Sequence, residues 1–194
     1  MPAFFLLLLF FATPFWEALP PAEWSNAQVR SMLIDSPWVQ GVGPNPIVQA
    51  VLATARPIEE AKTEIPRRGM SSPLTGAPPS RGPDIDYLDY VKRHREEHFV
   101  LAIPYPSLAG LGRADEEKRM ENECVMRVGR KRHALVGHFP PTPSDPVLRL
   151  IFPRAVAATD RSVAFDLYLP GLPQPARMLE FRVRDLIYHG KLEM

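Results

Sequence analysis

The chain has 194 residues, 45% hydrophobic and 23% charged, which is ordinary for a globular protein that can bury a core within one domain. Its 23 lysines and arginines oppose 22 acidic residues, and the net charge of +1 argues against wholesale or specific nucleic-acid binding. Proline is in excess, with 23 residues. Because proline lacks a main-chain donor and has a fixed φ, we expect short elements joined by long, proline-rich loops.

The N-terminal segment carries an apolar run, Phe4-Phe5-Leu6-Leu7-Leu8-Leu9-Phe10-Phe11-Ala12. It is too short for a transmembrane helix, which needs about 20 apolar residues, and its length suits the hydrophobic part of a signal peptide. We therefore expect residues 1–22 to be a signal peptide or N-terminal hydrophobic segment. The protein is then exported, periplasmic or extracellular, with no transmembrane helix in its mature form. The alternative is a cytoplasmic protein whose N-terminus is buried.

The next part of the chain predicts two helices and a strand. Ser25 is a natural N-cap, and Gln28 three residues later completes a capping box, so a helix begins here. Ser36-Pro37 ends it, because the residue before proline avoids the α region. A strand is expected over residues 47–53 and a short helix over 57–62, with a proline in its first turn.

The middle of the chain begins with a proline-rich loop at residues 65–83, which lacks apolar periodicity. Residues 84–98 predict a second helix, and residues 99–103 a fully apolar strand. A charged helix is expected over residues 115–123, followed by a strand over 124–128. Cys124 is the only cysteine, so it either pairs with another chain or is buried and unreactive, and we expect the buried form.

The C-terminal block shows the clearest periodicity. A strand over residues 147–152 leads to two alternating segments, residues 163–169 and 178–184, which predict an antiparallel hairpin around a long loop. One helical turn is expected over residues 185–188. The fold class is therefore α+β. We expect one domain over residues 23–194, with a mainly antiparallel sheet, a C-terminal hairpin and two to four short helices packed on the sheet.

Several ordered motifs resemble a family of uncharacterised exported bacterial proteins of similar size. The resemblance implies a signal peptide and a common α+β domain, and it implies no activity. The residues that carry it include a Ser-Pro-Trp motif and a C-terminal Gly-Lys-Leu-Glu motif; they are Trp24-Ser25, Val29, Met32-Leu33, Asp35-Ser36-Pro37-Trp38, Val51-Leu52-Ala53-Thr54-Ala55, Pro57-Ile58-Glu59-Glu60-Ala61, Phe99-Val100-Leu101-Ala102 and Tyr188-His189-Gly190-Lys191-Leu192-Glu193-Met194.

One candidate metal motif is present. His94-Arg95-Glu96-Glu97-His98 matches the H-x-x-E-H pattern of a class of zinc peptidases. On a helix, both histidines fall on one face, and Glu97 lies beside them as a base. The neighbouring cations Lys92, Arg93 and Arg95 would oppose a dication, and no third ligand follows in a recognisable context. We therefore expect the charged end of a helix, without a metal or cofactor.

The densest basic patch consists of Arg127, Arg130, Lys131 and Arg132, around a turn at Gly129. Like charges on a short turn repel one another, and an acidic or polyanionic partner would relieve that repulsion. The alternative is that these cations lie at a solvated hairpin tip and bind no partner.

The function that these patterns favour is an exported binding or structural module of the cell envelope without catalytic activity. The alternative is a zinc-dependent hydrolase that uses His94, Glu97 and His98.

Overall fold

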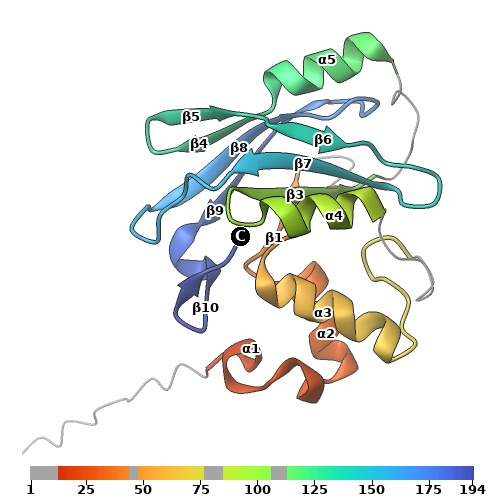
Figure 1. Ribbon diagram of the computed structural model, residues 1–194, viewed down its shortest axis with the longest axis vertical. Helices are drawn as coiled ribbons and strands as arrows, with labels where there is room; N and C mark the ends of the chain where they lie inside the picture. The colour runs from red at the N-terminus through yellow and green to blue at the C-terminus, as the bar shows by residue number, and fades with distance from the viewer. Residues whose placement is uncertain (1–12, 44–47, 77–84, 106–112) are drawn as a thin grey trace, which may run out of the picture.

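The computed structural model describes residues 13–43, 48–76, 85–105 and 113–194, and confirms the α+β class (Figure 1). A five-stranded sheet has the order β1-β2-β3-β7-β6, and every neighbouring pair is antiparallel. Its strands are β1 (Val39–Val42), β2 (Val48–Leu52), β3 (His98–Pro104), β6 (Gly137–Phe139) and β7 (Val147–Pro153). The β3–β7 ladder pairs seven residues on each strand, from His98 opposite Pro153 to Pro104 opposite Val147.

A second sheet has the order β5-β4-β8-β9 and is also antiparallel throughout. It contains β4 (Val125–Val128), β5 (Lys131–Ala134), β8 (Ser162–Tyr168) and β9 (Ala176–Arg182). The β8–β9 pair confirms the predicted C-terminal hairpin. Beyond it, a short 3-10 helix, η2 (Val183–Leu186), leads into a two-stranded ribbon of β10 (Ile187–Tyr188) and β11 (Lys191–Leu192).

The two sheets pack face to face through phenylalanines. Phe99 of β3 and Phe152 of β7 lie opposite each other in the ladder, with ring centroids 6.0 Å apart. Phe165 of β8 meets Phe152 edge-on at 5.1 Å and Phe181 of β9 at 6.1 Å. All four side chains are fully buried. Alternation along β3 and β7 therefore sends one face of each strand into a core shared by both sheets.

The other face of β3 and β7 is apolar as well. Val100 and Ile151 lie there in a second buried cluster, which also contains Tyr87 and Val91 of α4 (Ile85–His94). Figure 1 shows α4 lying along β3, with α3 (Arg56–Arg67) and α2 (Asn26–Ile34) beyond it. A strand that is buried on both faces has apolar residues at consecutive positions, which explains the run of apolar residues in β3.

Local signals placed several helices correctly. The capping box at the start of α2 is present: the Ser25 hydroxyl accepts from the Gln28 amide, and the Gln28 side chain accepts from the Ser25 amide. The charged helix is α5 (Ala114–Glu123), which lies against β8 and contacts β6 through His138 and Glu117. Met120 is its one buried side chain.

Several boundaries differ from the sequence prediction. The expected short helix over residues 57–62 is α3, which continues to Arg67 and so takes the first residues of the predicted loop, 65–83. It continues because Ile58, Ala61 and Ile65 form one buried stripe at helical spacing. The helical turn expected over residues 185–188 lies at η2, two residues earlier, and β6 was not predicted. Part of the loop, residues 77–84, lies outside the described residues.

The second helix also ends early. α4 stops at His94, and residues 95–97 form a turn before β3 starts at His98. Arg154, which follows β7, fixes this turn: its main-chain N–H donates to the Glu97 carbonyl oxygen at 2.8 Å, and its Nε donates to the Arg95 carbonyl oxygen at 2.6 Å. A tertiary contact from Arg154, the residue after β7, therefore ends α4.

The N-terminal residues that the structure describes pack against the core. Phe15 and Trp16 lie in α1 (Phe15–Ala18), and a short 3-10 helix, η1 (Pro21–Glu23), follows. Phe15 meets Trp24 edge-on at 5.4 Å, and Trp16 meets Trp38 at 6.1 Å. The apolar run at residues 4–12 lies outside the described residues, so the start of the mature chain stays a prediction.

Among the described helices, none has the length and apolarity to cross a membrane.

Replacing both Phe15 and Trp16 by alanine is expected to lower the free energy of unfolding by about 2 kcal/mol or more, because two half-buried aromatic side chains leave the core. Denaturant unfolding followed by far-ultraviolet circular dichroism measures this loss. Met178→Ala, at a residue that is 69% exposed, serves as the control and should change stability little. Equal stability of the double variant and the wild type would show that this segment does not belong to the folded domain.

Candidate functional site

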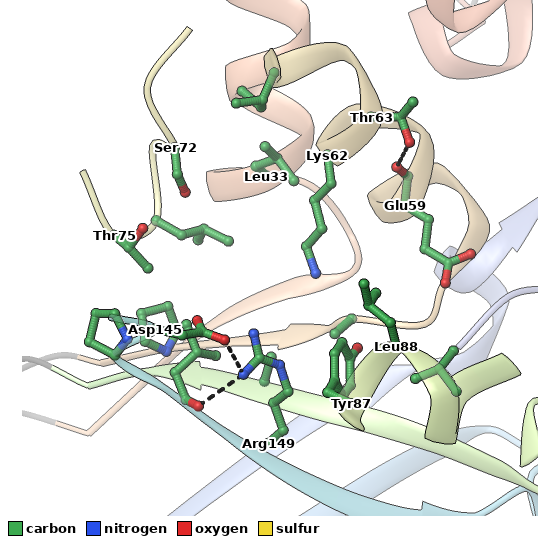
Figure 2. Close-up of a pocket in the computed structure, with 18 of the residues that line it drawn as sticks. Leu33, Glu59, Lys62, Thr63, Ser72, Thr75, Tyr87, Leu88, Asp145 and Arg149 are labelled. Carbon is green, nitrogen blue, oxygen red and sulfur yellow. Dashed lines mark hydrogen bonds and ion pairs between the residues drawn. The ribbon is translucent and has the colours of Figure 1, made fainter. Parts of the chain in front are cut away.

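A cavity of about 720 Å³ lies between α3, α4 and the outer face of the five-stranded sheet. Figure 2 shows side chains from these three elements and from residues 72–75 converging on it. Most of the lining is apolar and comes from Leu33, Ile65, Leu74, Leu88, Val91 and Val147. Its volume is in the range of pockets that hold small-molecule ligands, which are mainly apolar with a few polar groups that fix orientation.

Arg149 lies on the floor of the cavity, in the middle of β7. It is buried, with 8% of its side chain exposed, and forms an ion pair with Asp145 at 2.8 Å. Its guanidinium lies over the Tyr87 ring, 4.4 Å from the centroid. Burial also raises the pKa of Tyr87 to about 12, so the ring keeps its neutral hydroxyl. Arg149 is therefore held in one place by a carboxylate and an aromatic face.

A second ion pair closes the side of the cavity where α3 meets the end of α4. Glu59 of α3 pairs with Arg95, which directly follows α4. The Thr63 hydroxyl donates to the main-chain oxygen of Glu59 at 2.9 Å (Figure 2). Both pairs neutralise charges that the cavity wall would otherwise carry.

Lys62 of α3 differs from the other charged groups of the lining. Its side chain is half-buried and points across the cavity toward Arg149 (Figure 2). Within the described part of the chain its ammonium has neither a hydrogen bond nor an ion pair. The pKa of Lys62 is lowered to about 8, mainly by burial and secondly by the nearby charge of Arg149. Two cations therefore face each other across an apolar space, and only one of them has a carboxylate partner.

This arrangement suits one kind of chemistry. A partly buried cation without a partner loses hydration, and an anion placed between Lys62 and Arg149 would offset that cost. The surrounding apolar wall suits a ligand with an apolar body. Within the described residues, the lining presents no histidine or cysteine that would act as a base or nucleophile beside Lys62.

The structure brings together the three residues of the H-x-x-E-H motif, but not on a helix. One ligand atom each from His94, Glu97 and His98 lies within 4.8 Å of the others. Because α4 ends at His94, the turn that follows it makes this contact, rather than the helical face that the motif predicts. None of the three residues lines the cavity.

The basic patch lies on the β4–β5 hairpin, at the edge of the second sheet (Figure 1). Arg127 is paired with Asp166 of β8 at 2.9 Å, so it is part of the sheet surface. Arg130, Lys131 and Arg132 are exposed at the turn. The four residues therefore divide into one paired cation and three solvated ones.

Cys124 is buried and free, as expected. Its sulfur lies between the main-chain N–H and carbonyl oxygen of Tyr168, at 3.4 and 3.6 Å. Burial raises the pKa of its thiol to about 11, which keeps it protonated and unreactive at neutral pH.

Sequence reasoning missed the cavity and its charged groups. One signal was available: Arg149 interrupts an otherwise apolar strand, Val147-Leu148-Arg149-Leu150-Ile151-Phe152. A charged residue in a buried strand is rarely tolerated without a partner or a function. Lys62 carried no such signal, because a lysine on a short helix is ordinary in sequence.

Comparison of this chain with known proteins finds no relative. Neither the models of protein families, nor the curated proteins, nor the solved structures contain a match to this chain. The similarity to an exported bacterial family stays a prediction from sequence motifs.

Lys62→Met is expected to stabilise the protein at pH 7, because methionine fills a similar volume without a desolvated charge. The pKa of Lys62 is lowered from 10.5 to about 8, so the unfolded chain binds more protons between these values and the wild type gains stability as pH rises through that window. The advantage of the variant should therefore be full below pH 8 and shrink toward pH 10.5. Denaturant titrations across this range measure it. Lys92→Met, which removes an exposed cation at the cavity mouth, is the control for the loss of a lysine charge. A stability difference between Lys62→Met and the wild type that does not change with pH would contradict the desolvation of Lys62.

Replacing Arg130, Lys131 and Arg132 by glutamine is expected to shorten retention on a heparin column, because the three exposed charges are adjacent. A control with the same charge change removes the scattered, exposed cations Arg30, Lys118 and Lys191. If both triple variants elute at the same salt concentration, the hairpin tip has no particular affinity for polyanions.

Proposed function

We propose that this protein is a non-catalytic binding module that holds a small amphipathic anion in the cavity between α3, α4 and the five-stranded sheet. The observation that carries the proposal is the Lys62 ammonium, which faces Arg149 across an apolar cavity and has no partner within the described residues. The ligand has a carboxylate or similar head between these two cations and an apolar body against the lining.

The charges of the lining support an anion rather than a cation or a neutral ligand. Four cations, Lys62, Lys92, Arg95 and Arg149, face two carboxylates, Glu59 and Asp145. Each carboxylate already pairs with an arginine. A positively charged ligand would add to the repulsion that Lys62 experiences, and a neutral one would leave it in place.

The shape of the cavity supports an apolar body. The leucines and valines of the lining lie on elements from both the helical layer and the sheet, so a ligand is enclosed by rigid structure on both sides. Such a site needs little rearrangement to bind, which preserves affinity.

The location that we propose is the cell envelope, after export. The support for it is the apolar run at residues 4–12, whose length suits a signal peptide, together with the motif resemblance. An acidic or polyanionic envelope partner for the exposed hairpin cations is part of the same proposal. The zinc-dependent hydrolase stays an alternative prediction, since it requires a metal at His94, Glu97 and His98.

The test is calorimetric titration of the full chain with dodecanoate, a carboxylate with an apolar chain, beside dodecanol and dodecyltrimethylammonium. We expect dodecanoate to bind in a one-to-one ratio and at least about tenfold more tightly than either comparison ligand, since a charge-assisted contact contributes about 1.5–3 kcal/mol. Lys62→Met should remove this preference, and its fold is expected to be at least as stable as that of the wild type.

Lys92→Met is the matched control, because it removes the same charge at the exposed edge of the same cavity. It should leave most of the dodecanoate affinity intact. Equal affinity of dodecanoate for the wild type and Lys62→Met would refute the proposed anion site.

A further inference from the structure

We infer that His94, Glu97 and His98 form a binding site for a divalent transition-metal ion, of which zinc is the best fit, at the junction of α4 and β3. This site is separate from the anion cavity and does not depend on the function proposed for it.

The ligand atoms lie close enough to share one ion. One atom from each of the three side chains lies within 4.8 Å of the others, and Nδ1 of His94 lies 3.5 Å from a Glu97 carboxylate oxygen. A zinc ion with ligands at about 2.0–2.2 Å holds its ligand atoms roughly 3.5 Å apart. Side-chain rotations that move an atom by about 1 Å therefore complete the set.

The second histidine is held in position by a neighbour. The Tyr90 hydroxyl lies 2.8 Å from Nδ1 of His98, and the two rings are stacked with an interplanar angle of 9°. The Tyr90 ring also packs against His94, with centroids 4.6 Å apart. A histidine held through one ring nitrogen presents the other to a metal, and such outer contacts are the usual support of metal-binding histidines.

The turn that carries Glu97 is fixed as well. The Glu97 amide donates to the His94 carbonyl oxygen at 3.1 Å, and Arg154 binds the turn from the other side through the Glu97 and Arg95 carbonyl oxygens. His98 is anchored by its place in the β3–β7 ladder, opposite Pro153. All three ligands therefore come from backbone with defined positions, so little backbone conformational entropy is lost on binding.

The neighbouring cations, which argued against a metal at the level of sequence, are directed elsewhere. Arg95 is paired with Glu59, and Lys92 lines the anion cavity. Arg93 donates from Nε to the main-chain oxygen of Asp89. Of these three cations, Arg95 is neutralised by a carboxylate, and the groups that would contact the ion are one carboxylate and two imidazoles. Zinc and its neighbours in the transition series prefer such a ligand set.

The metal would join the end of α4 to the start of β3. The Glu97 side chain is 72% exposed and that of His94 36% exposed, so an ion can enter from solvent and keep water in its remaining positions. The cluster lies outside the cavity lining, so metal binding there does not require the anion ligand.

The experiment is titration of the full, untagged chain with zinc chloride, followed by calorimetry. A parallel titration with cobalt chloride is followed by visible absorption. Both are done at about pH 7.5, where a free imidazole is mostly unprotonated. We expect one zinc per chain, a melting temperature that rises with zinc concentration, and a cobalt spectrum typical of low coordination. His94→Ala, His98→Ala and Glu97→Gln should each weaken zinc binding at least about tenfold.

The control is His138→Ala. His138 lies beside Glu117 at 2.9 Å and Glu121 at 3.5 Å, so it is a histidine with neighbouring carboxylates that lies outside the proposed site. This variant should keep full zinc affinity. The inference is overturned if zinc fails to bind in a one-to-one ratio, if His98→Ala binds it as tightly as the wild type, or if His138→Ala abolishes binding.

Discussion

The pairing of β3 with β7 is the interaction on which the rest of the structure depends. The ladder is seven residue pairs long, and both of its faces are buried. One face carries Phe99 and Phe152 into the core between the sheets, and the other supports α4 and the floor of the cavity. Because side chains alternate across a strand, one ladder holds together three layers. The same ladder sets the positions of Arg149 and His98.

Both candidate sites follow from how this ladder meets the helices. Arg149 projects from the outer face of β7, and α3 places Lys62 opposite it, so the cavity lies where the helical layer does not fill the space over the sheet. At the end of the ladder, Arg154 fixes the turn between α4 and β3 and brings His94 and Glu97 to His98. The cavity includes the partly desolvated cation Lys62, which reduces stability; in the function that we propose, the same cation attracts the anion.

Much of the fold was predictable from local patterns. The hairpin of β8 and β9 followed from strict alternation, and the start of α2 followed from the capping box at Ser25. The errors lie where distant residues decide. α4 ends at His94 because Arg154 binds the next turn, and no pattern within residues 84–98 contains that information. β6 forms only because β7 offers it an edge, since its own residues have little strand character.

The sequence by itself determined the α+β class, the main strands and the presence of an H-x-x-E-H motif, because each depends on residue type and short spacing. Only the tertiary structure decided which charges are paired. Lys62 and Arg149 lie far apart in the chain yet face each other across the cavity, and Arg95 turns from the motif toward Glu59. Charge pairing depends on distances across packed layers, which local spacing does not encode.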